Sequence, residues 1–379
     1  MRAIDLIDGA WLGRWLGRLT ERQTEIAFGA GTMLVVVLGL VAGEVLARSY
    51  DALRAPPPGF DWYALMDAMQ PGDEGAPPRF APGTEAGGIA INALGFRGPD
   101  IAADKPEGTI RLAFLGDSKL FSAEHAEEEM IAAQVTDRLA ARAPACRFDQ
   151  VTVAGPAYTM DHLAQLVRTD VAPLDPDVHV VLSGSMRDVL HLHAEADARG
   201  GYTLHYPWLV LQSRFADKLF RAFHLARQER QARHEGPKPD GELADIAQAF
   251  DGPAGRLADA IGQTPVLAIG YRGQLREGLP LDEQMAHTRQ LRHETRGLGA
   301  RDLARLNTLL VTAQDQAAQR LGWTFIDPIA DIAPVAENFT DQSHFSRRGI
   351  AQLSDAVADA LLPMLADQGM ACLGGEAMP

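Results

Sequence analysis

The sequence lacks several features that would point to common classes of protein. It contains only two cysteines, Cys146 and Cys372, among 379 residues, which is too few for a disulfide framework or for a zinc site built from cysteine alone. Basic residues are also scarce, because 35 Lys and Arg stand against 50 Asp and Glu and leave a formal net charge of −15. No local stripe of Lys and Arg offsets this acidity, so a nucleic-acid partner is not expected.

The overall composition is that of a folded protein with at most one membrane span. Hydrophobic residues make up 46% and charged residues 22%, which excludes a largely disordered chain and a collagen-like rod. At roughly 150 residues per domain, the length allows one large domain or two modest ones with a sizeable core. A mean hydropathy of −0.10 excludes a polytopic membrane protein.

One uncharged hydrophobic run, residues 26–43, lies near the N-terminus. Since backbone polar groups in hydrocarbon must be satisfied within their own segment, a run of this length predicts one transmembrane helix, which we place at residues 26–47. Four arginines lie ahead of the run and two, Arg48 and Arg54, lie just after it. This bias predicts a single-pass inner-membrane protein with most of the chain in the periplasm. A cleaved signal peptide is the alternative, but its hydrophobic core is usually shorter.

The segments on either side of this helix have their own patterns. Residues 1–25 place apolar side chains at helical spacing and arginines on another face, which predicts an amphipathic helix in the membrane interface. A cytoplasmic helix docked on a partner protein is the alternative. Residues 48–89 are rich in Pro and Gly and predict a linker, with a short helix around Trp62–Met69.

Residues 90–370 predict one α/β domain. From residue 109, longer helical patterns alternate with short apolar runs, which lie at residues 110–115, 151–154, 178–182, 265–269 and 324–326. This alternation predicts a parallel sheet covered by helices on both faces, in three layers. Ligands of such sheets bind beyond the carboxyl ends of the strands, so the informative residues should follow the runs. Residues 189–240 fit no single crossover helix and predict an insertion, whose aromatic residues form a lid or a docking face or pack in the core.

Two polar motifs stand where this architecture puts functional residues. Gly116, Asp117 and Ser118 directly follow the first run, and a serine at a tight strand-to-helix turn exposes its hydroxyl at the sheet edge. Near the C-terminus, Asp341 and His344 lie three residues apart, ahead of a helical pattern. A serine hydroxyl needs a base such as histidine to become nucleophilic, and a carboxylate orients the imidazole. Taken singly, each motif is also compatible with an ordinary loop.

Together the two motifs resemble the SGNH (GDSL-type) hydrolase family. LAFLGDS at 112–118 matches the family's first block and FTDQSHFSRRG at 339–349 its last, while NALGFRGPD at 92–100 is similar to membrane-anchored, extracytoplasmic members. The resemblance implies a five-stranded parallel sheet of flavodoxin-like order. It also implies that Ser118 is the nucleophile, that His344 is the general base, and that Asp341 orients the histidine.

The middle blocks of the family match less closely. Gly155, after the second run, is the best candidate for the backbone N–H that joins that of Ser118 in the oxyanion hole, with Ala157 as the alternative. After the third run the family has Gly-x-Asn-Asp, in which the asparagine is a further donor. This chain matches the aspartate with Asp188 but has Arg187 where asparagine is expected. Arginine donates hydrogen bonds with a different geometry, so the hole is either rebuilt around Arg187 or weakened.

The resemblance implies a Ser-His-Asp esterase or O-acyltransferase that acts on acyl esters of an extracytoplasmic glycan or polysaccharide. For a transferase, it implies a membrane-bound acyl donor protein as a partner. No cofactor and no metal are expected. The alternative is a catalytically weak, SGNH-like structural or docking subunit of a membrane complex, which the departure at Arg187 favours. The two cysteines could pair in an oxidising compartment, but the sequence gives no distance between them.

Overall fold

The computed structural model describes residues 20–53, 61–70, 72, 76–196, 212–295 and 297–373. Residues 197–211, which hold several aromatic residues of the predicted insertion, lie outside this set. The chain forms two compact units, which we describe separately. The smaller unit contains helix α2 (Glu21–Leu53) and the start of helix α9 (Arg214–Glu235), and the larger unit contains the remaining elements.

Helix α2 is long and apolar enough, by length and composition, to cross a membrane. It contains the predicted span and extends beyond both of its ends. Large apolar side chains along the helix are exposed, among them Leu34, Leu38 and Leu46, so they are available for contact with lipid. The interfacial helix predicted for residues 1–25 falls almost entirely outside the described residues.

Within the smaller unit, Glu44 of α2 binds the start of α9. Its carboxylate accepts hydrogen bonds from the hydroxyl of Ser213 (2.8 Å) and from the backbone N–H groups of Arg214 (3.3 Å) and Phe215 (3.0 Å). A helix begins with unpaired N–H groups and a partial positive charge, so a carboxylate there stabilises it. The ring of Phe215 lies only 2.9 Å from where a Cβ atom at Gly43 would stand. This part of the predicted insertion therefore packs on α2.

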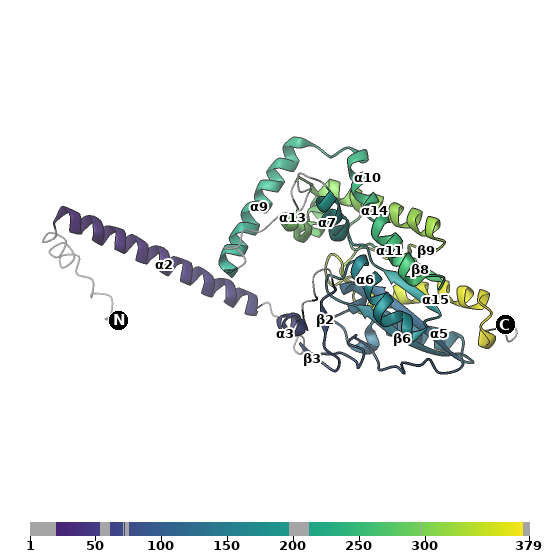
Figure 1. The fold of residues 1–379 in the computed structure, drawn as a ribbon. Coiled ribbons are helices and arrows are strands. Elements are labelled where there is room, and N and C mark those ends of the chain that lie inside the picture. The colour runs from purple at the N-terminus through teal and green to yellow at the C-terminus, as the bar shows by residue number, and fades with distance from the viewer. Residues whose placement is uncertain are drawn as a thin grey trace. The chain divides into compact units, whose positions relative to one another are not determined.

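The larger unit, drawn with its helices in Figure 1, is built on a five-stranded parallel sheet in the order β6-β5-β7-β8-β9. Its strands are β5 (Thr109–Gly116), β6 (Arg147–Ala154), β7 (Val178–Leu182), β8 (Val266–Ile269) and β9 (Thr324–Ile326). The inner strands β5 and β7 are almost wholly buried, because helices cover both faces, and this explains their continuous apolar sequences. The predicted fold class is confirmed, and each of the five predicted runs is a strand.

Helices lie on both faces of this sheet, and two hydrophobic clusters fill the space between the layers. One face is covered by α5 (Ile131–Arg142) and α15 (Arg347–Asp367), and the other by α6 (Met160–Leu166), α7 (Met186–Ala196), α10 (Asp240–Gln248), α11 (Asp251–Ile261) and α14 (Ala300–Leu321). Further short helices of the larger unit are α4 (Ser118–Phe121), α12 (Leu281–His287) and α13 (Arg289–Glu294). Along β5, Leu112 and Phe114 face the first cluster and Ala113 and Leu115 the second, as expected from the alternation of side chains along a strand.

The short helix predicted around Trp62–Met69 is present as α3 (Trp62–Ala68). The rest of residues 61–90 differs from the predicted linker, because it forms two small antiparallel pairs, β1 (Met69–Gln70) with β2 (Arg79–Phe80) and β3 (Glu85–Ala86) with β4 (Ile89–Ala90). Leu65, Phe80 and Ile89 are buried in the same hydrophobic cluster as β5. These apolar side chains attach a Pro- and Gly-rich segment to the body of the larger unit.

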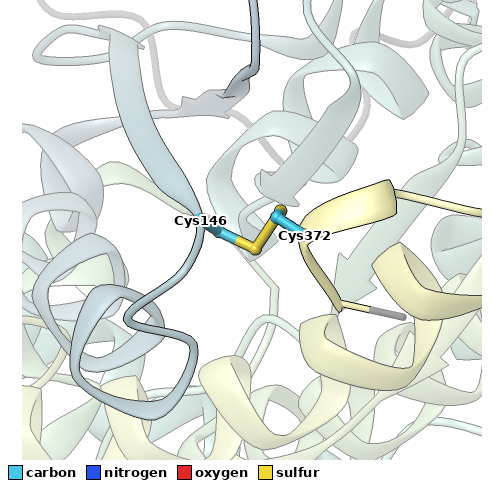
Figure 2. Close-up of a disulfide and its surroundings, with 2 residues drawn as sticks. All are labelled: Cys146 and Cys372. Carbon is cyan, nitrogen blue, oxygen red and sulfur yellow. A yellow bond between two sulfur atoms is a disulfide. The ribbon is translucent and has the colours of Figure 1, made fainter. Parts of the chain in front are cut away.

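A disulfide joins Cys146, just ahead of β6, to Cys372 in the turn that follows α15 (Figure 2). The Cα atoms of the two cysteines are 5.1 Å apart, within the usual range for a disulfide. The pairing that the sequence left open is therefore present. It fastens the end of the last long helix to an edge strand and bridges a sequence separation of 226 residues.

Replacing both cysteines by alanine should lower the free energy of unfolding by about 2–5 kcal/mol, because the unfolded chain would lose the restraint of a large covalent loop. Denaturant unfolding of the wild type and of Cys146→Ala/Cys372→Ala, each with and without a reductant, would measure this difference. The reductant should lower the free energy of unfolding of the wild type but not that of the double variant. An unchanged midpoint in the double variant would contradict the prediction.

Candidate active site

Ser118 stands at the carboxyl end of β5, where the strand turns directly into α4. Asp117 is the N-cap of this short helix, and its Oδ1 atom accepts a hydrogen bond from the backbone N–H of Lys119 (3.0 Å). Gly116 has no room for a side chain, because a Cβ atom there would lie 2.6 Å from the carbonyl oxygen of Leu182. The Gly-Asp-Ser motif thus forms the sharp turn that presents a serine at the sheet edge.

His344 and Asp341 lie in the connection between β9 and α15 and meet Ser118 at this edge. The Nε2 atom of His344 is 2.9 Å from Oγ of Ser118, and its Nδ1 atom is 2.8 Å from Oδ2 of Asp341. Because an ionised carboxylate only accepts hydrogen bonds, Nδ1 carries the proton and Nε2 is left to accept one from the serine. The structure therefore brings together three side chains that the motifs singled out.

The second oxygen of Asp341 fixes the loop that carries the histidine. Its Oδ1 atom accepts hydrogen bonds from the backbone N–H groups of Ser343 (2.7 Å) and His344 (2.8 Å). Burial raises the pKa of Asp341, but its hydrogen bonds and the imidazole outweigh burial and hold this pKa well below its usual range. Burial lowers the pKa of His344, but the hydrogen bond to Asp341 and its charge raise that pKa above its ordinary value. Asp341 is therefore ionised at neutral pH and stabilises an imidazolium at His344.

A buried polar cluster supports the turn at Ser118. The hydroxyl of Tyr271 donates a hydrogen bond to Oδ2 of Asp117. The side chain of Lys119 is only 3% exposed, and its Nζ atom lies 3.5 Å from the centroid of the Tyr271 ring and donates to the carbonyl of Arg272. Burial lowers the pKa of Lys119 to about 7. Both oxygens of Asp117 are thus engaged, which fixes the backbone that carries the serine.

The three side chains open into a cavity of about 500 Å³. Its other lining residues come from several helices and connections and include Met66, Glu124, Ala157, Arg187, Tyr271 and Leu291. The wall combines apolar side chains with many polar and charged ones, so it can contact both kinds of group on a bound molecule.

The predicted oxyanion donors differ in their access to this cavity. Ala157 is exposed and lines the cavity with a left-handed φ of 61°, whereas Gly155 is buried, and a Cβ atom there would meet the ring of Tyr158 at 2.7 Å. A left-handed conformation in a residue other than glycine costs energy and often marks a functional turn. Arg187, at the start of α7, is exposed and lines the same cavity as Ser118. The placement thus favours Ala157 over Gly155, and the donor roles stay predictions.

Asp188, which matches the family's aspartate, caps helix α7. Its Oδ2 atom accepts a hydrogen bond from the backbone N–H of Ser185 (3.1 Å), and the hydroxyl of Ser185 accepts one from the N–H of Asp188 (3.2 Å). This reciprocal pair satisfies two N–H groups at the helix start. Burial raises the pKa of Asp188 to about 7, and the charge of Asp117 adds to this effect. The aspartate therefore holds the turn that presents Arg187.

The motifs did not predict Tyr271 or Glu124. Tyr271 follows β8 closely, so the rule that functional residues stand after strand ends could have identified it. Glu124 lies in the connection between α4 and α5, and one of its carboxylate oxygens is within 4.8 Å of a carboxylate oxygen of Asp341 and of a ring nitrogen of His344. Its charge also helps to raise the pKa of His344. No local pattern in the sequence marks this position.

Comparison with known proteins finds no match to a protein-family profile and none to a curated protein. Among solved structures, TesA is 14% identical over 67% of this chain and 99% of its own, with a TM-score of 0.40. The lipase/acylhydrolase from Enterococcus faecalis is 13% identical over 66% of this chain and 95% of its own, with a TM-score of 0.38. Axe2, an acetylxylan esterase from Geobacillus stearothermophilus, is 14% identical over 70% and 95%, with a TM-score of 0.37. Similarities this low carry no conclusion about activity.

The fold and the site agree with what the sequence resemblance implied. The strand order is flavodoxin-like, the serine follows the first strand of the sheet, and Asp-x-x-His precedes the last long helix. The serine, the histidine and the aspartate form a hydrogen-bonded triad. The resemblance to SGNH-type hydrolases implied this strand order and these positions of the three residues.

Asp341→Asn should lower the rate of ester cleavage by up to about 10⁴-fold, because an amide favours the wrong imidazole tautomer and cannot stabilise the imidazolium. In the wild type, the rate should rise with pH as His344 loses its proton, with an inflection above the ordinary histidine value of 6.5. The variant's inflection should move to lower pH, because the charge that raises this pKa is removed. Profiles of p-nitrophenyl acetate hydrolysis against pH would measure both effects, and superimposable profiles would contradict them.

Proposed function

We propose that this protein is a serine ester hydrolase or O-acyltransferase that acts outside the cytoplasm on acyl esters of a glycan or polysaccharide. The observation that carries the proposal is the pair of hydrogen bonds from Ser118 through His344 to Asp341, at 2.9 and 2.8 Å. Such an arrangement turns an alcohol into a nucleophile at neutral pH, and here it opens into a cavity of about 500 Å³.

In the proposed reaction, Oγ of Ser118 attacks the acyl carbonyl carbon while Nε2 of His344 takes the serine proton. The backbone N–H groups of Ser118 and of Ala157 or Gly155, with Arg187 as a charged donor, stabilise the oxyanion. Collapse of the tetrahedral intermediate breaks the ester bond, and His344 gives its proton to the leaving alcohol. Water then attacks the acyl-serine to release the acid, or a glycan hydroxyl attacks it and becomes acylated.

Two features support an extracytoplasmic location. The Cys146–Cys372 disulfide belongs in an oxidising compartment such as the periplasm. Helix α2 supplies an apolar segment long enough for a single span, and the excess of arginine ahead of it favours a cytoplasmic N-terminus. An enzyme tethered in this way would act on polymers at the membrane surface. As a transferase, it would take its acyl group from a membrane-bound donor protein.

A second candidate function is a catalytically weak docking subunit of a membrane complex. The observation that favours it is Arg187, which stands where the family has an asparagine amide. Loss of one oxyanion donor lowers the rate of related reactions by about 100- to 1,000-fold. In that case the anchored helix and the insertion, rather than the triad, would carry the function.

A fluorophosphonate probe separates the two candidates. It should phosphonylate the wild type at Ser118, identified by mass spectrometry of the labelled peptide, because the neighbouring imidazole activates this hydroxyl. Ser118→Ala should remain unlabelled, while the control Ser354→Ala, on the buried face of α15, should react like the wild type. A folded wild type that does not react would refute the proposed catalytic activity and favour the docking subunit.

The proposed topology predicts the behaviour of fusion proteins. Alkaline phosphatase is active only in the periplasm, so its fusion to the C-terminus of the full chain should be active. Green fluorescent protein fused at the same position should remain dark after export, and it serves as the matched control. The opposite pattern would place the larger unit in the cytoplasm and contradict the proposal.

A further inference from the structure

The segment at residues 92–98 forms a closed turn ahead of β5. The side-chain Oδ1 atom of Asn92 accepts hydrogen bonds from the backbone N–H groups of Leu94 and Phe96, both at 3.0 Å. Arg97 follows directly, and its side chain is only 4% exposed. A buried arginine is costly unless its donors are satisfied, so its partners reveal what it does.

Arg97 donates to three backbone carbonyls just downstream of the nucleophile. They belong to Phe121, Ser122 and His125. Phe121 ends α4, and Ser122 is its C-cap, with a left-handed φ of 50°. Carbonyls at a helix end have no partner within the helix, and a charged donor satisfies them strongly. Burial lowers the pKa of Arg97 to about 10, which still leaves it charged at neutral pH.

His125 extends this contact to the loop of the general base. Its Nε2 atom is 2.8 Å from the carbonyl oxygen of Phe345, the residue directly after His344. Since a carbonyl only accepts, Nε2 of His125 carries a proton and donates it to this bond. The His125 side chain is 8% exposed and Phe345 is 3% exposed, so water has little access to the contact.

We propose that Arg97 and His125 are positioning residues that hold the nucleophile and the base in register, that is, at a fixed distance and orientation to each other. Arg97 fixes the turn behind Ser118, and His125 ties this turn to the residue next to His344. The two partners of the 2.9 Å triad contact are thereby joined by a second route that avoids the reacting atoms. The inference rests on the proposed function, because register matters only if a proton passes between serine and histidine.

The triad needs such a route because neither the serine nor the histidine stands on a long, rigid element. Helix α4 has four residues, and the connection that carries His344 runs from the end of β9 at Ile326 to the start of α15 at Arg347. A long connection keeps one conformation only through its contacts with the rest of the fold. Misplacement of a reacting group by about 1 Å can cost about 100-fold in rate, so a loop that drifts would impair the reaction while the protein remains folded.

Substitutions at His125 test the proposal with p-nitrophenyl acetate as the probe ester. His125→Leu removes the donor to Phe345 and should lower kcat by up to about 100-fold with little change in KM. His125→Gln offers an amide N–H in its place and should recover most of the loss. The rate of fluorophosphonate labelling should fall in parallel with kcat, because it depends on the same activated serine. The NMR resonance of the His344 Nδ1 proton should persist, since its bond to Asp341 lies within one loop.

Arg97→Gln should lower kcat in the same way, and Arg97→Lys should do so less, because lysine keeps the charge. Two matched controls are Arg138→Gln, which removes bonds to backbone carbonyls of α5 and α15, and His179→Leu, which replaces a buried imidazole inside β7. Both controls should keep the wild-type kcat. Thermal unfolding of every variant would set an assay temperature at which all of them are folded.

A folded His125→Leu with the wild-type kcat would overturn the inference, and so would a loss that the Gln variant fails to recover. A loss of the His344 Nδ1 resonance in His125→Leu would also overturn it, because the residue would then maintain the base itself rather than its register with serine. A wild type that neither reacts with the probe nor cleaves the ester would instead refute the proposed function, and the inference with it.

Discussion

The hydrogen bond of 2.9 Å between Ser118 and His344 is the contact that the rest of this fold has to position. A parallel sheet gathers the carboxyl ends of its strands at one edge, which brings the two residues to the same side of the molecule. They do not come from neighbouring strands, however, because β7 and β8 lie between β5 and β9. Neighbouring strands lie about 4.8 Å apart, so the chain after β9 has to return across about 14 Å of the sheet to bring the histidine to the serine. The long connection ahead of α15 covers this distance, and its internal hydrogen bonds and its contact with His125 give it a defined end point.

The fold was predictable from the sequence because buried parallel strands need continuous apolar runs, and the runs in β5 and β7 are clear. The triad was predictable because Gly-Asp-Ser and Asp-x-x-His are local patterns with a chemical reason. His125 and Tyr271 were not identified, because their partners lie far away in sequence and only the folded chain brings them close. The choice between Gly155 and Ala157 likewise depends on backbone conformation, which residue type alone does not determine.

Packing between distant segments was the other feature that local patterns could not show. The composition of residues 48–89 predicted a linker, yet Leu65 and Phe80 are core residues of the larger unit. In the same way, the position of Glu44 at the end of the apolar run does not predict that its carboxylate caps a helix 170 residues further along the chain.

Inside the site, two carboxyl groups have opposite surroundings. Asp341 accepts several hydrogen bonds and is ionised, whereas burial beside Asp117 favours the protonated form of Asp188.

The disulfide has a consequence for the response of the chain to proteolysis. Cys146 precedes the predicted insertion and Cys372 follows it, so a cut within the insertion would divide the polypeptide and leave both fragments covalently linked. One fragment would carry the first three strands of the sheet with the serine, and the other the last two strands with the histidine. In an oxidising compartment, a nicked molecule would therefore keep both parts of its triad, and electrophoresis without a reductant would not separate the fragments.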